Sequence, residues 1–157
     1  MSNRKTIIKS INWTISIDLF IAFSLFLYIT DFEFIGFFKF LKSLFINLSV
    51  GILGLFFVGN IVGRNLYRLK SKSKNYQIYH GILSIFIILI GGVLIGSCVG
   101  FLEEGLPNKR YKYDLIGELY DYFFKPIYWI LIFGFIPTFI SGVILGFVLK
   151  RLPIMDN

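Results

Sequence analysis

Asp18 is the residue whose type and position offer the most chemistry, because it is a carboxylate inside a long apolar stretch. It lies about 10 Å into a helix that begins near Ile11, by the rise per residue of an α-helix. A charged side chain in hydrocarbon costs about 3 kcal/mol on insertion scales, so we expect Asp18 to face the helix bundle or to be protonated. Its helical face is small and polar near the acid, and the residues that align on that face are Ile11, Thr14, Asp18, Ala22 and Leu25.

Two interpretations of Asp18 stay open. It is either a proton- or cation-handling site or gate, or a neutral or paired acid that only fixes the register of the helices. No second acid shares its predicted depth, so a relay of acids is not expected. Its potential partners come from the inner halves of the other predicted helices: Asn60, Arg64, Ser84 and Ser141, with His80 added only if its helix sits deeply.

Glu103 and Glu104 form a second acidic feature, which we call the outer acidic lip. Carboxylates after a helix oppose its macrodipole, so we expect them to pair with nearby cations or to line an outward mouth. In an assembly they could ring the entrance of a cation pore. Paired glutamates also suit acid–base catalysis, but no nucleophile or metal-ligand set accompanies them. The nearby cations are Lys109, Arg110 and Lys112.

Other catalytic chemistry has few residues to work with. His80 is the only histidine and Cys98 the only cysteine, so a histidine-based zinc site, a Ser-His-Asp triad and an internal disulfide are not expected within one chain. The sequence therefore predicts a non-enzymatic protein without a cofactor or metal.

Glycines recur at intervals of four in three apolar segments, as in GGVLIGSCVGFLEEG at residues 91–105. A phosphate-binding loop would need these glycines at a strand-to-helix turn, which this apolar context does not provide. Rows of small residues let membrane helices approach closely, so we expect packing within the chain, with an oligomer interface or a pore lining as the alternatives. The rows are Gly59 and Gly63; Gly92, Gly96 and Gly100; and Gly134, Thr138, Gly142 and Gly146.

The elements that must position these residues are predicted to be membrane helices. Of the 157 residues 56% are hydrophobic and only 16% charged, and the mean hydropathy is +0.75. A span needs about 20 apolar residues. The sequence therefore predicts an all-α, polytopic membrane protein, a single domain over 1–157. The four spans are expected at about 11–29, 44–62, 82–102 and 126–149.

The two outer loops are predicted to contain short interfacial helices. DFEFIGFFKFLKS, residues 31–43, is too apolar for water and too charged to span, so we expect it to lie in the headgroup layer or to lengthen the second span. YDLIGELYDYFFKP, residues 113–126, has an apolar helical face and ends at Pro126, which suits the first turn of the fourth span. Pro137 lies inside that span, where we expect a kink.

Charge distribution predicts the orientation. Basic residues gather before the first span, between the second and third, and after the fourth, so both termini are expected in the cytoplasm. The phenylalanine, isoleucine, lysine and asparagine content is typical of AT-rich coding and indicates a low-GC bacterium, hence its cytoplasmic (inner) membrane. We call the loop cluster the basic surface: Arg64, Arg68, Lys70, Lys72 and Lys74.

Three functional hypotheses follow. The leading one is a homo-oligomeric membrane subunit that forms a pore or anchors a soluble cytoplasmic partner through the basic surface, with anionic lipid as a second partner. Small four-span components of anti-phage defence and toxin-immunity systems share this outline, by analogy of architecture alone. The alternatives are a small proton-coupled transporter using Asp18 and, last, a membrane-embedded enzyme. The net charge of +7 is explained by topology and does not indicate nucleic acid.

Overall fold

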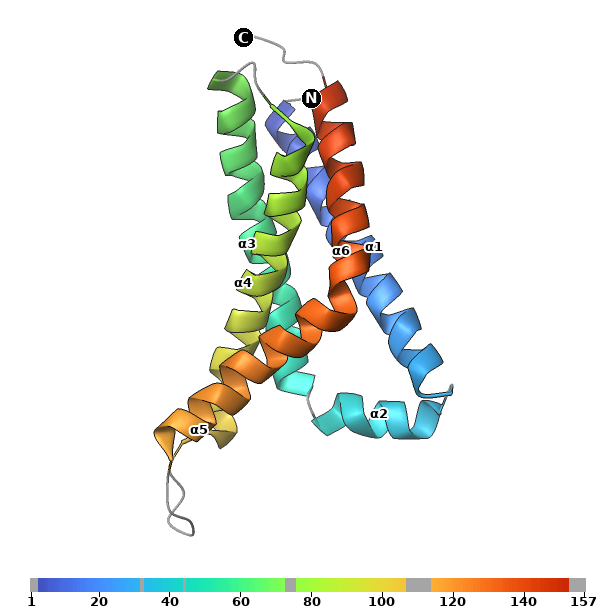
Figure 1. Ribbon diagram of the computed structural model, residues 1–157, viewed down its shortest axis with the longest axis vertical. Coiled ribbons are helices and arrows are strands. Elements are labelled where there is room, and N and C mark those ends of the chain that lie inside the picture. The colour runs from blue at the N-terminus through green and yellow to red at the C-terminus, as the bar shows by residue number, and fades with distance from the viewer. Residues whose placement is uncertain (1–2, 32, 44, 73–75, 107–113, 153–157) are drawn as a thin grey trace.

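The protein is a bundle of long helices (Figure 1). The computed structural model describes residues 3–31, 33–43, 45–72, 76–106 and 114–152. The elements in chain order are α1 (Asn3–Ile29), α2 (Phe34–Ser43), α3 (Phe45–Lys72), α4 (Ile78–Glu104), α5 (Leu115–Leu119), the π-helical segment η1 (Tyr120–Phe124) and α6 (Lys125–Arg151).

Within the described residues, four helical stretches are long and apolar enough to cross a membrane: Arg4–Ile29, Phe45–Ser71, Ile78–Glu104 and Leu115–Arg151. The prediction of an all-helical protein with four such helices is therefore confirmed. Each stretch corresponds to one predicted span and extends beyond it at one end or at both. The second begins at Phe45, close to the predicted start at about 44. Helix α1 packs on α3, α3 on α4, α4 on α6, and α6 closes the ring against α1.

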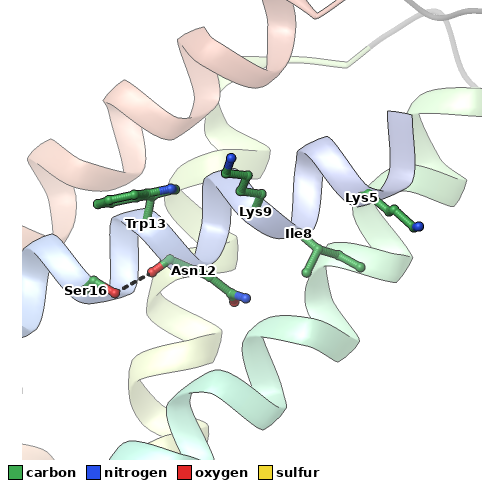
Figure 2. A pocket seen from close by; sticks show the side chains of 6 residues that line it. All are labelled: Lys5, Ile8, Lys9, Asn12, Trp13 and Ser16. Atoms are coloured by element: carbon green, nitrogen blue, oxygen red, sulfur yellow. Dashed lines mark hydrogen bonds between the residues drawn. The ribbon is translucent and has the colours of Figure 1, made fainter. Parts of the chain in front are cut away.

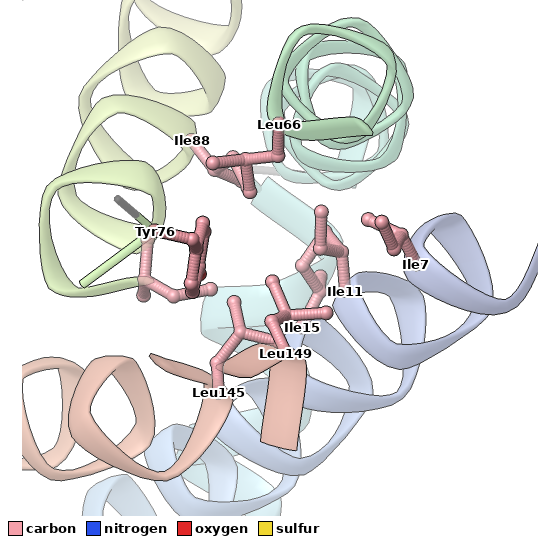
Figure 3. Close-up of a cluster of buried hydrophobic side chains, with 9 residues drawn as sticks. Ile7, Ile11, Ile15, Leu66, Tyr76, Ile88, Leu145 and Leu149 are labelled. Carbon is pink, nitrogen blue, oxygen red and sulfur yellow. The ribbon is translucent and has the colours of Figure 1, made fainter. Parts of the chain in front are cut away.

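The hydrophobic core lies at one end of the bundle. It is built from the first half of α1, the last turns of α3, the start of α4 and the end of α6, whose side chains meet around one axis (Figure 3). Ile11, Ile88, Leu145 and Leu149 are almost completely buried. We call this end of the bundle the closed end. The beginning of α1 and the end of α6 both lie there (Figure 1).

At the other end, which we call the open end, the helices diverge (Figure 1). The second half of α1 leans away from α4 and α6, and α2 lies across this end, between α1 and α3. Within the segment predicted to be interfacial at residues 31–43, Phe34–Ser43 forms a helix. Asp31 ends α1 with a left-handed φ of 49°, a conformation that aspartate tolerates better than most residues.

The segment before α6 differs from its prediction. A separate interfacial helix was expected, but α5 and η1 run directly into α6. Pro126 has no N–H to donate, and the Lys125 N–H donates to Tyr120 O, five residues back. A π-type turn therefore absorbs the proline without breaking the helix.

Close backbone contacts join α4 to its two neighbours. A Cβ added at Gly81 would lie 2.5 Å from Gly146 Cα, and one at Gly142 would lie 2.7 Å from Ile82 Cα. On the other side, a Cβ at Gly96 would lie 3.3 Å from Gly51 Cα of α3. These distances leave no room for a side chain, so the small residues allow the helices to touch.

Candidate functional site

The candidate site is centred on Asp18, where α1 meets α6. The Ser141 hydroxyl of α6 donates a hydrogen bond to Asp18 Oδ1. Ser141 is buried and Asp18 is half-buried. Of the partners considered from the sequence, Ser141 is the one whose hydrogen bond with Asp18 is found.

A cavity of about 550 Å³ is lined in part by Asp18. It lies between α1 and α6, with α3 and α4 as its back wall. Its lining is almost entirely apolar, and Asp18 and Thr138 supply the polar side chains. The lining residues are Ile15, Asp18, Leu19, Ala22, Leu25, Phe26, Ile29, Leu55, Ile85, Ile88, Leu89, Trp129, Ile130, Phe133, Gly134, Pro137 and Thr138.

Asp18 lies in the inner part of this cavity, one helical turn from Ile15, which lines it nearer the closed end. Toward the closed end, Ile11, Leu145 and Leu149 fill the space between the helices completely. Toward the open end, the rims are exposed: Trp129 is 53% and Phe133 is 60% accessible. The cavity therefore opens between α1 and α6, and Asp18 is the one carboxylate among the described residues that line it.

The bend of α6 makes room for the cavity. Pro137 lies near the middle of α6, the part of the helix that bends in Figure 1. Proline cannot donate the backbone bond to Phe133 O and crowds that carbonyl, so it is the expected cause of a kink. The second half of α6 follows α4 at the closed end, while its first half turns away from α1. Pro137 and Gly134 form part of the cavity wall.

No lysine, arginine or histidine is found among the described residues that line the cavity around Asp18. Among the described residues that line the cavity, Asp18 is the only ionisable side chain. Arg64 is exposed on α3. His80 accepts a hydrogen bond from the Gln77 backbone at 3.1 Å at the start of α4, and Ser84 donates to His80 O at 2.6 Å. Neither His80 nor Ser84 is bonded to the acid.

Lys70 departs from the prediction of an exposed basic surface. It is only 7% accessible, and its Nζ donates to Leu149 O and, at 2.6 Å, to Leu152 O. The last carbonyls of a helix lack partners within it, and a cation there complements the macrodipole. The aromatic ring of Tyr76 lies 5.7 Å from Nζ. Lys70 thus ties the end of α3 to the end of α6.

The remaining members of the basic surface are not gathered into one site. Arg64 and Arg68 are exposed on α3. The Lys72 side chain and all of Lys74 lie outside the described residues. Figure 2 shows a further basic feature on α1, a shallow groove of about 360 Å³. Its lining residues are Lys5, Ile8, Lys9, Asn12, Trp13 and Ser16.

The outer acidic lip is exposed at the end of α4. Glu104 accepts a hydrogen bond from the Tyr122 hydroxyl at 3.2 Å, and Glu103 is exposed to solvent. The expected partners Lys109, Arg110 and Lys112 lie outside the described residues. In the described part of the chain, His, Cys, Asp and Glu side chains do not form a group of three or more that could hold a metal ion.

The glycine rows contact different neighbouring helices. Gly59 and Gly63 face Ile15, Ile11 and Ile8 of α1, while Gly92 faces Leu55 and Gly100 faces Asn47, both on α3. Gly142 and Gly146 lie against the start of α4. Gly134 differs, since a Cβ there would meet no atom closer than 3.8 Å, and it faces the cavity together with Thr138.

Sequence reasoning singled out Asp18, but it did not find the cavity. The aromatic part of the wall, formed by Phe26, Trp129 and Phe133, was not identified as a site. The available signal was a set of small or helix-bending residues on two helices, and the structure shows that all of them line the cavity: Ala22, Gly134 and Pro137.

Comparisons with known proteins add nothing to this geometry. No family model matches the chain, and no curated protein and no solved structure matches it either.

Proposed function

We propose that this protein is a small proton-coupled membrane transporter. Its substrate would enter the cavity between α1 and α6, and Asp18 would carry the coupled proton. The observation that carries this proposal is the carboxylate of Asp18 in an almost entirely apolar cavity, where it is the one acid among the described lining residues. A purely structural acid would be expected to be enclosed by its partners, whereas Asp18 has one hydroxyl partner and faces an open space.

The size and lining of the cavity support a small-molecule site. Ligand pockets usually measure about 300–1,000 Å³ and combine apolar walls with few polar groups. The cavity of about 550 Å³ fits that description. A neutral carboxylic acid is tolerated in such surroundings far better than a carboxylate, so loading and release of a proton would change how Asp18 interacts with a guest.

The two ends of the bundle support a transport cycle. The closed end is packed and tied by Lys70, while the open end gives access to Asp18. Alternating access requires a second arrangement in which the closed end separates and the open end closes. The bend at Pro137 is the natural hinge for α6 in that change.

The direct test is proton movement in proteoliposomes that contain a trapped pH-sensitive dye. A pH gradient is imposed, and a panel of lipophilic cations, anions and neutral compounds is added in turn. At least one compound should move protons in liposomes with the protein and not in liposomes without it. Asp18→Asn should remove that signal while the purified protein keeps its helical content and elution volume. If no compound class moves protons, the transporter proposal fails.

The sequence-based hypothesis of a pore or membrane anchor remains the second candidate. Its support is the exposed basic side chains at the closed end, including Arg64, Arg68, Lys150 and Arg151. The glycine contacts described above lie within one chain, so they supply no argument for a homo-oligomer. A partner-recruiting anchor would lose its partner in an Arg64→Gln, Arg68→Gln double variant, whereas a transporter would keep its flux.

The orientation belongs to the same proposal. We place the closed end at the cytoplasmic face of a bacterial inner membrane, since the exposed basic residues gather there. The groove on α1 then lies at the headgroup level, where Lys5, Lys9 and Trp13 suit anionic lipid (Figure 2). A cysteine at Arg68 in a Cys98→Ser background should resist an impermeant maleimide in intact cells. Labelling of that cysteine from outside would reverse the orientation.

A further inference from the structure

We infer that the cavity between α1 and α6 binds a lipophilic organic monocation, whose positive centre replaces the proton of Asp18. The inference rests on the proposed function and names the class of its substrate. It is argued from the aromatic and aliphatic side chains of the cavity wall and from the lack of a cation among its described residues.

The wall lacks a built-in counter-ion. Among the described residues, Asp18 is its only ionisable group, and the neighbouring helices contribute only neutral side chains. α6 supplies the Ser141 and Thr138 hydroxyls, α4 supplies Ile85 and Ile88, and α3 supplies Leu55. An ionised carboxylate in such a place needs a partner of opposite charge. A proton or a cationic guest can fill that need, and an anionic guest would add a second unpaired charge.

The hydrogen bond from Ser141 uses only part of the hydrogen-bond acceptor capacity of the Asp18 carboxylate. A carboxylate has two oxygens with about four acceptor positions. The hydroxyl of Ser141 donates to Oδ1, on the α6 side. The carboxylate also borders the cavity, where a guest can approach it. The hydroxyl thus orients the acid. The negative charge of the carboxylate needs a positive partner, which a guest in the cavity can supply.

The rest of the wall suits a bulky apolar cation. Trp129 and Phe133 stack on each other on α6, with ring centroids 5.8 Å apart, and Phe26 lies on the α1 side of the same cavity. Aromatic faces attract a cation that has lost its water, and indole is the strongest of them. Aliphatic side chains of α1 and α4 would cover the remaining surface. A small hydrated ion would gain little from such a wall.

The exchange is balanced in charge. With a proton bound, Asp18 is a neutral acid and the cavity is empty of charge. When the cation enters, the acid releases its proton to the solution and the resulting carboxylate pairs with the guest. The site is neutral overall before and after the exchange, so neither form leaves an uncompensated charge in hydrocarbon. One proton is released for each cation bound.

The test compares tetraphenylphosphonium with tetraphenylborate, two ions of the same shape and opposite charge, by calorimetry on the purified full chain. Tetraphenylphosphonium should bind with release of one proton, measured in buffers of different ionisation enthalpy. Below the titration range of Asp18, its affinity should fall by about tenfold for each unit of pH decrease. Asp18→Asn should weaken binding by at least about thirtyfold and abolish the pH dependence. Asp18→Glu should retain the preference for the cation.

Equal binding of tetraphenylborate by the wild type would overturn the inference, and so would tight, pH-independent binding of tetraphenylphosphonium. The comparison of the two ions needs no variant, so it tests the inference even if Asp18→Asn does not fold. The outcome is also separable from the transporter proposal. If a neutral or anionic compound drives proton movement, the substrate class is wrong and transport stands. If the cation binds with proton release but is never transported, the binding site stands and transport fails.

Discussion

Asp18 of α1 and Ser141 of α6 are hydrogen-bonded at the boundary between the packed core and the open cavity. On one side of this pair the helices are held together by fully buried aliphatic side chains. On the other side they diverge. The acid therefore sits where a change in the angle between α1 and α6 would alter its surroundings most. Such a position is suited to coupling a charge to a conformational change.

Ser141→Ala tests the orienting role of this hydroxyl. Hydrogen bonds between membrane helices contribute about 0.6–1.5 kcal/mol, so we expect the affinity for tetraphenylphosphonium to fall about threefold to tenfold. The loss should be smaller than in Asp18→Asn, because the charge remains. Ser97→Ala, which removes another buried hydroxyl on α4, should leave the affinity unchanged. An equal loss in both variants would show that the hydroxyl acts only through general stability.

Ala22→Phe tests the cavity itself. Ala22 faces the cavity from α1, and a phenyl ring there would occupy part of the space without displacing the core. We expect binding of the cation to fall by at least about tenfold, as expected when a site is sterically filled, with no loss of thermal stability. The matched control is Ser24→Phe, an exposed position on α1 outside the cavity. Undiminished binding by Ala22→Phe would place the ligand elsewhere.

Gly81→Ala tests the close contact of α4 with α6. The added methyl would lie 2.5 Å from Gly146 Cα and 2.7 Å from Gly142 O, and this backbone cannot move aside cheaply. We expect a loss of about 1–3 kcal/mol, measured by unfolding in mixed detergent and dodecyl sulfate micelles. Gly134→Ala is the control, since its methyl would meet no atom closer than 3.8 Å. Equal stability of the two variants would contradict the helix contact described here.

Lys70→Met tests the tie at the closed end. Methionine keeps the length and apolar body of the side chain but loses the donors to Leu149 O and Leu152 O. We expect the free energy of unfolding to fall by about 1–3 kcal/mol, the usual cost of leaving buried polar groups unpaired. Hydrogen exchange should rise in the last turn of α6. The exposed Lys150→Met is the control. Burial raises the pKa of Tyr76 to about 12, so its ring stays neutral beside Lys70 at physiological pH.

The helices were predictable from the sequence because continuous apolar runs and their flanking charges leave few alternatives. The extent of the fourth stretch was not, because Pro126 normally marks a helix start and a π-type turn overrode that signal. Asp18 was predictable as a site, since a carboxylate in an apolar helix is costly. The cavity depends on how far α1 leans from α6, which no local pattern encodes. Lys70 was missed for the same reason: its burial depends on where α6 ends.

Accumulation of tetraphenylphosphonium in proteoliposomes, driven by an interior more acidic than the medium, tests the proton-coupled account most directly. The account predicts accumulation by the wild type that collapses when the pH gradient is dissipated. Asp18→Asn, reconstituted in equal amount and with the same helical content, should accumulate no more than protein-free liposomes. The account would be contradicted if Asp18→Asn accumulated tetraphenylphosphonium at the wild-type rate, or if accumulation by the wild type did not depend on the pH gradient.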